Sequence, residues 1–399
     1  MNPQINKLHS IALKPERLII GLMSGTSMDG LDIALCVCKG YGASSQISIR
    51  EFITIPYDDD FRSEIKAVFS LRNADLQKVC ILNEVIAIRH AGMILKALSD
   101  WEIEAAEIDL IASHGQTIFH APRILHGQNV YPNATLQIGD GDHIAVRTGI
   151  ITISDFRQKH VAAGGEGAPL AVYGDFLMFS HPAENRVMLN IGGIANFTFL
   201  PADQDAAKVF STDVGPGNTI MDQYMQAHYP GSYYDKDARI AAAGMVNEDL
   251  LHELYSDDFF MSDFPKTTGP ELFNLDYLQS ARQRSHTESL SHEDVMATLC
   301  MLSAKAIIRA VDKCFAASDS VVIYMSGGGM HNPVLVDHLK AGLPGARFKT
   351  TKDLGIDPDA KEAVLFAVLA NETIAGGPID FGKRQGVPSV CMGKICLPE

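Results

Sequence analysis

The sequence predicts an α/β protein built from two domains. The chain has 399 residues, which is long enough for two hydrophobic cores. Strand-like apolar segments alternate along it with helical patterns, an order typical of α/β proteins. The pattern also restarts near Arg186, where a second apolar strand is interrupted by a glycine pair and followed by another strand.

Bulk composition argues against several classes of partner and location. Apolar residues make up 46% of the chain and charged residues 20%, as in ordinary soluble proteins. The formal net charge is −15 and no block of Lys or Arg occurs, so we expect neither nucleic acid nor an anionic membrane as partner. No signal peptide or membrane span is expected. Seven Cys without CxxC spacing predict reduced thiols and a cytoplasmic protein.

The first elements predicted are two strands joined by a polar turn, in "IIGLMSGTSMDGLDIALC" (19–36). Apolar residues alternate with smaller or polar ones after the turn, which is the period of a strand. Residues 75–101 follow as a long helix with an apolar stripe. Two buried strands come next, in "IDLIASHG" and "GIITISDF". We predict an N-terminal domain over 1–153, completed by 375–399.

The second half of the chain is predicted as a C-terminal domain over 154–374. Its first two strands lie in "RVMLNIGGIANFTFLP", and a strand, turn and helix follow in "AKVFSTDVGPGNTIMDQYM". A long helix begins at Ser291, with Asp294 at the spacing of a capping box. The segment "SVVIYMSGGGMHNPVLVDHL" reads as a buried strand, a glycine triplet and a helix capped by Asn332.

Three glycine-rich turns predict a nucleotide-binding site. The turns are "SGTSMDG", "NIGGIAN" and "SGGGMHNP", and each follows an apolar strand. Glycine lets a backbone approach a ligand closely, and consecutive N–H groups in such turns bind anions. No Lys follows these turns as a P-loop requires, and "GDGDHI", "GEGAPL" and "GPGNTI" lack the third Gly of a dinucleotide fingerprint. The pattern therefore favours a phosphate cradle made from β-hairpin tips.

The order of the motifs carries a family resemblance. "GLMSGTSMDGLD", "SHGQT", "DFRQKHVAAGGEGAPL", "LNIGGIAN", "DVGPGNTIMD" and "SGGGMHNP" follow one another from about Leu18 to about Pro388. Together they resemble the anhydro-N-acetylmuramic acid kinase family, within the actin/Hsp70/sugar-kinase superfamily. The resemblance implies two actin-like (ribonuclease H-like) lobes, each a mixed sheet flanked by helices, with an ATP cleft between them.

The implied activity is a hydrolysis coupled to a phosphoryl transfer. Enzymes of this family open the anhydro ring of 1,6-anhydro-N-acetylmuramic acid with water and phosphorylate O6, giving N-acetylmuramic acid 6-phosphate in peptidoglycan recycling and amino-sugar catabolism. The implied cofactors are ATP and Mg²⁺, and the implied partner is the small-molecule sugar. Whether the protein forms a homodimer is left open. The alternative is an actin-like ATPase or chaperone. A chaperone would need a peptide-binding domain, for which no residues remain.

The glycine-rich turns supply the nucleotide-binding residues that the resemblance implies. "GTSMDGLD" would wrap the phosphates, and Asp29 or Asp32 would orient Mg²⁺ through water, although either Asp could instead only cap its turn. "NIGGIAN" would be the second phosphate hairpin, and "GGGMHNP" would receive the adenosine. The predicted residues are Gly25, Thr26, Ser27, Met28, Asp29, Gly30, Leu31, Asp32, Asn190, Gly192, Gly193, Gly327, Gly328 and Gly329.

Two carboxylates are candidates for the chemistry. Asp213 ends a strand and precedes "VGPGN", a place where an Asp also commonly forms a turn. Motif matching makes it the base that takes a proton from the attacking water. Glu362 matches an acidic family position at the start of a helix and would be an auxiliary base, or a solvated Glu at a helix N-terminus.

The sugar-binding candidates come from three motifs and one cation. Arg157 can pair bidentately with a carboxylate such as the lactyl group of muramic acid, although it could also form an ordinary surface ion pair. The spacing of six between His114, His120 and His126 does not suit a zinc site, so no protein-bound metal is predicted. The predicted substrate-binding residues are His114, Gln116, Thr117, Arg157, Gly164, Gly165 and Lys266.

Overall fold

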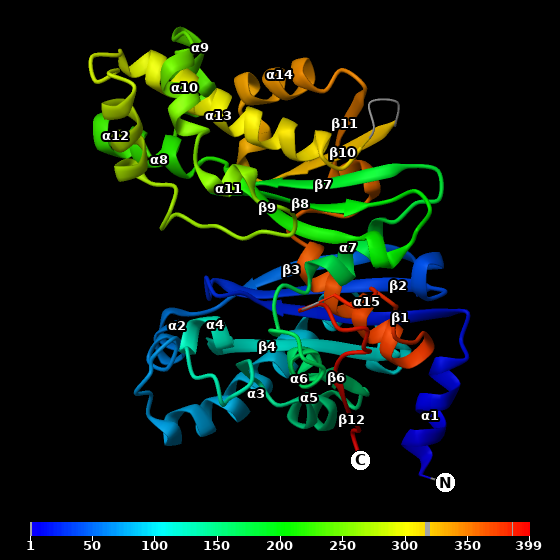
Figure 1. Ribbon diagram of the computed structural model, residues 1–399. Helices are drawn as coiled ribbons and strands as arrows, with labels where there is room; N and C mark the ends of the chain where they lie inside the picture. The colour runs from blue at the N-terminus through cyan, green and yellow to red at the C-terminus, as the bar shows by residue number, and fades with distance from the viewer. Residues whose placement is uncertain (1, 316–319, 385) are drawn as a thin grey trace. The chain divides into compact units, whose positions relative to one another are not determined.

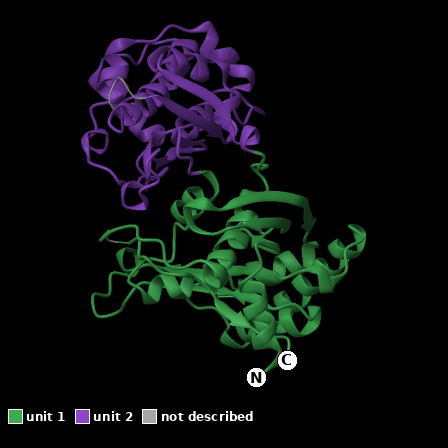
Figure 2. Ribbon diagram, turned by 90° about the vertical axis from the view of Figure 1, so that its right-hand side faces the viewer, with its two compact units in different colours: residues 1–179, 355–399 green, residues 180–354 purple. Residues whose placement is uncertain are grey.

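The computed structural model describes residues 2–315, 320–384 and 386–399. It divides into two compact units, one of residues 1–179 and 355–399 and the other of residues 180–354 (Figure 2). This division differs from the domain boundaries expected at 153/154 and 374/375. The reason is that α7 (Ala171–Phe179) packs against α15 (Lys361–Ala375), and α15 packs on the central strand of the first sheet.

Unit 1 contains a sheet of seven strands within the described residues. Its main path runs β12-β6-β4-β1-β2-β3, and β5 pairs with β4. Strands β1, β2 and β3 pair antiparallel, while β4 and β6 continue parallel to β1. The strands are β1 Glu16–Ser24, β2 Gly30–Lys39, β3 Gln46–Pro56, β4 Leu110–Ala121, β5 Ala134–Ile138, β6 Thr152–Ser154 and β12 Lys394–Cys396.

Helices cover both faces of this sheet. On β1, Ile20 and Leu22 belong to the core that includes residues of α3, whereas Gly21 points to the opposite face against α15. A Cβ at Gly21 would lie 2.0 Å from the carbonyl oxygen of Ala363, so only Gly permits this packing. The remaining helices are α1 Pro3–Ala12, α2 Asp59–Lys66, α3 Leu76–Asp100, α4 Arg123–His126, α5 Gly141–Thr148 and α6 Phe156–Ala162.

Unit 2 contains a sheet of five strands in the described part of the chain, in the order β11-β10-β7-β8-β9. Strands β7, β8 and β9 pair antiparallel, and β10 and β11 run parallel to β7. The two sheets therefore share one order, a three-stranded meander followed by two parallel strands. This repeat is the ribonuclease H-like topology of actin-like proteins. The strands are β7 Asn185–Ile191, β8 Ile194–Leu200, β9 Phe210–Pro216, β10 Val321–Ser326 and β11 Ala346–Thr350.

The core of unit 2 forms around α13, a long helix that Figure 1 shows in yellow beside this sheet. Ser291 caps its start by accepting a hydrogen bond from the Asp294 N–H, as the sequence spacing predicted. Asn332 caps α14 in the same way. The helices are α8 Thr219–His228, α9 Arg239–Ala243, α10 Glu248–Leu254, α11 Asp258–Met261, α12 Leu275–Arg284, α13 His292–Asp312 and α14 Pro333–Gly342.

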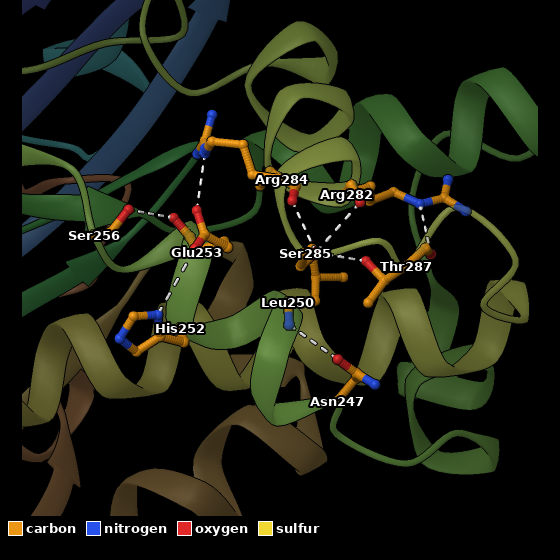
Figure 3. A network of polar contacts seen from close by, with 10 residues as sticks. Asn247, Leu250, His252, Glu253, Ser256, Arg282, Arg284, Ser285 and Thr287 are labelled. Atoms are coloured by element: carbon orange, nitrogen blue, oxygen red, sulfur yellow. Dashed lines mark hydrogen bonds and ion pairs between the residues drawn. The ribbon is translucent and has the colours of Figure 1, made fainter.

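A polar network joins α10 to α12 in the helical part of unit 2 (Figure 3). Arg284 Nε donates to Glu253 Oε2 at 2.8 Å, so the end of α12 is tied to α10. Ser285 and Thr287, just beyond α12, share a hydroxyl–hydroxyl hydrogen bond of 2.8 Å. None of these residues belongs to a motif singled out in the sequence, and the network is a structural brace.

All seven Cys are free thiols. Burial raises the pKa of Cys36, and the neighbouring Cys38 adds to the effect. Both thiols lie inside β2 and are fully covered. Within the described residues, the helices are all too short or too polar to cross a membrane.

Candidate active site

The first glycine-rich turn is the tip of the β1–β2 hairpin. The Met28 N–H donates to the Gly25 carbonyl at 3.2 Å, and the Tyr57 N–H donates to the Asp29 carbonyl at 3.0 Å. Met28 has a φ of +56° and a buried side chain, which anchors the turn in the core. Thr26 and Ser27 remain exposed between these fixed points. The turn is thus held at both ends and offers its middle to solvent.

The two glycines of this turn have different reasons to be glycine. A Cβ at Gly30 would lie 2.6 Å from the Ile55 carbonyl oxygen, so the packing of β2 on β3 requires Gly there. A Cβ at Gly25 would meet nothing closer than Ser27 Oγ at 3.4 Å, an ordinary contact, and its φ is not left-handed. The packing of the fold therefore does not require glycine at position 25.

Asp29 and Asp32 each use one carboxylate oxygen within the protein. Ser27 Oγ donates to Asp29 Oδ1 at 2.7 Å, and Thr54 Oγ1 donates to Asp32 Oδ1 at 2.6 Å. Burial raises the pKa of Asp32, and the negative charge of Asp29 adds to the effect. A cation beside the pair would relieve this repulsion. The neighbouring Leu31 is buried in the core.

The second glycine pair is the tip of the β7–β8 hairpin, which lies against the start of α8. The Asn218 N–H donates to the Gly192 carbonyl at 2.9 Å, and the Thr219 N–H donates to the Gly193 carbonyl at 3.0 Å. A Cβ at Gly192 or Gly193 would meet no atom closer than 3.6 Å. At these two positions, as at Gly25, packing within the chain does not require glycine. Asn190 lies on β7 just before the tip.

The third glycine turn joins β10 to α14. Gly327 has a φ of +80°, and a Cβ there would lie 2.6 Å from Asn190 Oδ1. A Cβ at Gly329 would lie 2.3 Å from Ile191 Cγ2. The middle residue, Gly328, is exposed and has no neighbour closer than 4.0 Å. The outer glycines thus pack against β7, and Gly328 presents open backbone.

Asp213 lies at a β-bulge near the end of β9. Asn196 pairs with Asp213, but the preceding Ala195 pairs with Gly215, so β9 carries one extra residue. Bulges of this kind re-aim side chains and are common beside active sites. The Thr268 N–H donates to Asp213 Oδ2 at 2.9 Å. Among the described residues, no donor reaches Oδ1, which is the oxygen left for a ligand.

The electrostatics of Asp213 suit a proton acceptor. Burial raises its pKa, the hydrogen bond from Thr268 lowers it, and the charge of Glu271 raises it. A raised pKa makes a carboxylate a stronger base. The raised pKa and the uncommitted oxygen together make this group a candidate base.

Lys266 lies beside Asp213, but its ammonium group is engaged within unit 2. The Asp213 N–H donates to the Lys266 carbonyl at 3.0 Å, which adds this segment to the edge of β9. Lys266 Nζ donates to the Phe259 carbonyl at 2.6 Å and lies 4.2 Å from the centre of the Phe259 ring. Burial lowers its pKa to about 8, and Lys313 adds to this effect. The side chain braces α11, and its backbone positions Asp213.

In unit 1, His114 holds the guanidinium of Arg157. Arg157 Nε donates to His114 Nε2 at 2.8 Å, and one of its terminal nitrogens donates to the Gly167 carbonyl at 2.6 Å. Because Nε2 accepts, Nδ1 carries the proton and donates to the Gly115 carbonyl at 2.9 Å. Burial lowers the pKa of His114 to about 3, and Arg157 contributes. His114 is therefore a neutral support for Arg157, with both ring nitrogens in use.

Glu362 lies in the first turn of α15, as predicted. Its surroundings raise its pKa by desolvation, while Arg157 lowers it and Asp32 raises it. Glu362 thus lies close enough to Arg157 and to Asp32 for the charge of each to shift its pKa.

The other sugar candidates differ in exposure. Gln116 is fully buried and both ends of its amide are bonded inside unit 1. Thr117 is half-buried and accepts a hydrogen bond from Gln137 Nε2 at 3.1 Å. Gly164 is exposed with open space around it, whereas Gly165 packs on the His160 ring, where a Cβ would lie 2.2 Å away. Of this group, Thr117 and Gly164 have surface to offer a ligand.

Comparison with known proteins agrees with the motif order. The family model described as anhydro-N-acetylmuramic acid kinase matches residues 17–396. The chain belongs to this family. A relative of that name from Pseudoalteromonas atlantica is 55% identical, and one from Pseudoalteromonas translucida is 53% identical, each with 100% of both chains covered. A third, from Caldanaerobacter subterraneus, is 39% identical over 98% of this chain and 100% of its own.

Membership in the anhydro-N-acetylmuramic acid kinase family makes the chain an enzyme of the phosphotransferase class, and a kinase implies the use of ATP. Sequence reasoning missed several residues that position the site. Thr268 holds Asp213, and Tyr57 and His90 lie behind the first hairpin. Thr268 lies two residues after Lys266 in "PKTTGPE", but no sequence spacing connects that motif to Asp213. Tyr57 and His90 read as ordinary core residues of a strand end and a helix.

Proposed function

We propose that the protein hydrolyses the anhydro ring of 1,6-anhydro-N-acetylmuramic acid and transfers the γ-phosphoryl group of ATP to O6. The product is N-acetylmuramic acid 6-phosphate, which places the enzyme in peptidoglycan recycling. The observation that carries the mechanism is Asp213, a carboxylate at a β-bulge with Oδ2 held by Thr268 and Oδ1 uncommitted. The identity of the substrate is inferred from the family to which the chain belongs.

The residues fit a nucleotide and a hydrated cation. Within the three glycine-rich turns, Gly25, Gly192, Gly193 and Gly328 are the glycines where a Cβ would meet no close neighbour, so their backbones are open to phosphate or adenosine. Asp29 and Asp32 each keep one carboxylate oxygen for the water shell of Mg²⁺. When bound, Mg²⁺ neutralises the charge that develops on the transferred phosphoryl group.

Asp213 starts the reaction by accepting a proton from water. The water oxygen bonds to C1 of the sugar, the C1–O6 bond breaks, and its electron pair stays on O6. O6 then bonds to the γ-phosphorus as the bond to the β-phosphate oxygen breaks. A base on the face opposite the leaving oxygen is the arrangement of an inverting glycosidase. The departing O6 needs no separate acid, because the phosphoryl group takes the place of a proton.

Arg157 is the residue that we assign to the carboxylate of the sugar. His114 and the Gly167 carbonyl fix its guanidinium, so part of the donor fork keeps one orientation. A fixed fork loses little side-chain entropy when it pairs with a carboxylate. Glu362 affects the same guanidinium and would be the auxiliary base. The alternative of an actin-like ATPase or chaperone is not favoured, since the model of a kinase family matches residues 17–396 of this chain.

Product analysis in ¹⁸O-water tests this function. With ATP, Mg²⁺ and the anhydro sugar, we expect a sugar monophosphate that carries one ¹⁸O at C1 and none in the phosphate. Product made in ordinary water and then placed in ¹⁸O-water controls for exchange at the anomeric carbon. A phosphorylated product without early ¹⁸O at C1, or ADP without sugar phosphate, would contradict the proposal.

A further inference from the structure

A second β-bulge lies beside the first hairpin. Leu22 of β1 pairs with Ser113 of β4. Ser24, two residues further along β1, pairs with Gln116, which lies three residues further along β4. The extra residue is accommodated at Gly115, which has a φ of +73° and would place a Cβ 2.6 Å from the Ile138 carbonyl oxygen. Because of this bulge, Gln116 lies directly opposite Ser24, at the base of the hairpin tip.

A buried chain of hydrogen bonds runs from α3 to this hairpin. Tyr57 Oη lies 2.8 Å from His90 Nε2 and donates to Ser24 Oγ at 2.8 Å. Ser24 Oγ donates to Gln116 Oε1 at 2.5 Å, and Gln116 Nε2 donates to the Gly25 carbonyl at 3.2 Å. All four side chains are at most 3% exposed. They are therefore shielded from solvent and from any sugar.

The direction of the chain follows from counting protons. Tyr57 has one hydroxyl proton and uses it on Ser24, so His90 must donate from Nε2. His90 Nδ1 is then a bare acceptor, which agrees with its being buried without a partner. Each donor thus points toward the hairpin, and bonds aligned in one direction polarise one another.

The chain ends on an atom that orients the hairpin backbone. The Gly25 carbonyl accepts from both Met28 N–H and Gln116 Nε2. A peptide group is planar, and in the trans form its N–H points opposite its carbonyl. Two donors on the Gly25 carbonyl therefore fix where the Thr26 N–H points, which is away from the core and toward the exposed middle of the turn.

We propose that Gln116 is a positioning residue for phosphate binding, which orients the Thr26 N–H through the Gly25 carbonyl, with Ser24, Tyr57 and His90 as its buried support. This replaces the expected contact of Gln116 with the sugar. The inference rests on the proposed phosphate-binding role of the first hairpin. It assigns to Gln116 an effect on the phosphates of ATP and none on adenosine, because the adenosine motif belongs to the other unit.

Binding measurements on Gln116→Met test the proposal. Methionine keeps the length and shape of the side chain but cannot donate to the Gly25 carbonyl. By isothermal titration with Mg²⁺, we expect the Kd for a non-hydrolysable ATP analogue to rise about tenfold, with the Kd for adenosine within twofold of wild type. The matched control is Gln137→Met, since Gln137 also bonds inside this sheet through its amide but does not touch the hairpin. The control should bind the ATP analogue as wild type does.

The outcomes separate this inference from the proposed function. If the wild-type protein fails to bind the ATP analogue, the phosphate-binding function itself is wrong. If wild type binds it and Gln116→Met binds it equally well, Gln116 has no positioning role. Equal losses for the analogue and for adenosine would indicate general structural damage and would also overturn the proposal. Should Gln116→Met not fold, Tyr57→Phe removes one bond of the same chain and should raise the analogue Kd about threefold.

Gln116→Glu supplies a readout that a purely structural role would not change. A protonated Glu can accept from Ser24 and donate to the Gly25 carbonyl, as Gln does, whereas an ionised Glu has no proton to donate. Burial raises the pKa of a carboxyl group, so both forms are accessible near neutrality. We expect analogue binding, relative to wild type at the same pH, to recover as the pH falls from 8.5 to 6. A ratio that does not change with pH would contradict the proposed donor role.

Discussion

At the scale of single residues, Asp213 combines a catalytic demand with a cost to the fold. Burial and the charge of Glu271 make ionisation of this carboxyl group less favourable in the folded protein. A folded-state pKa above the unfolded value means that the folded protein binds the proton more tightly, so Asp213 contributes least to stability once it is ionised. The enzyme would therefore tolerate a mildly destabilising ion because the reaction needs a base there.

Replacing Asp213 by Asn should separate activity from stability. Asn can still accept the hydrogen bond from Thr268 but cannot take a proton from water. We expect turnover to fall by about 10²–10⁴-fold, the usual contribution of a general base, with sugar and ATP binding nearly intact. The melting temperature at pH 7 should not fall, since the buried charge is gone. Turnover within threefold of wild type would contradict the assignment and would move the role of base to Glu362.

The pH dependence of activity should report the same group. Asp213 is a base only when ionised, so kcat/KM should rise with pH through its pKa, and the acid limb should lie above the ordinary value for Asp. Glu271→Gln removes a charge that raises this pKa, so the acid limb should move to lower pH in that variant. An acid limb that stays in place would show that another group controls it.

At the scale of elements, the two glycines of the first hairpin tip are glycine for different reasons, and this difference can be tested. Gly25→Ala meets only an ordinary contact at 3.4 Å, so the free energy of unfolding should change by less than about 0.5 kcal/mol. Gly30→Ala meets the Ile55 carbonyl at 2.6 Å and should cost about 1–3 kcal/mol.

The same pair of variants should diverge in ligand binding. We expect Gly25→Ala to weaken ATP-analogue binding about tenfold or more while remaining fully folded. Gly30→Ala should lose stability in urea unfolding, and its folded fraction should keep more of the affinity. If Gly25→Ala binds the analogue as wild type does, close approach of a ligand is not the reason for that glycine.

Elements of the fold were predictable where one local pattern governs them. The alternation after Leu31 and the caps at Ser291 and Asn332 gave the strands and helices that the structure has. The repeat of a hairpin in the second half was visible for the same reason. The two bulges were not predictable, because each depends on pairing with a strand distant in sequence. The proposed role of Gln116 and the contact of Thr268 with Asp213 involve residues at those bulges, so they were not visible either.

At the scale of the whole molecule, the chain passes twice between its units, after Phe179 and after Leu354. Unit 1 is therefore assembled from two separate segments. Its C-terminal segment supplies α15, which fits over Gly21 of the central strand. From the sequence we expect a return to the first domain, but only from residue 375, since α15 reads simply as the last helix of the second half. Unit 2 is one continuous segment with its own core around α13.

The continuity of unit 2 predicts that residues 180–354 fold without the rest of the chain. A continuous segment with its own hydrophobic core meets the usual condition for independent folding. We expect this fragment to give a cooperative thermal transition and to bind adenosine through the turn at Gly327–Gly329, with an affinity within about tenfold of the full chain. The fragment 1–179, in contrast, lacks α15 and leaves the face of β1 around Gly21 uncovered, so it should not unfold cooperatively. A non-cooperative 180–354, or a cooperative 1–179, would contradict this division of the molecule.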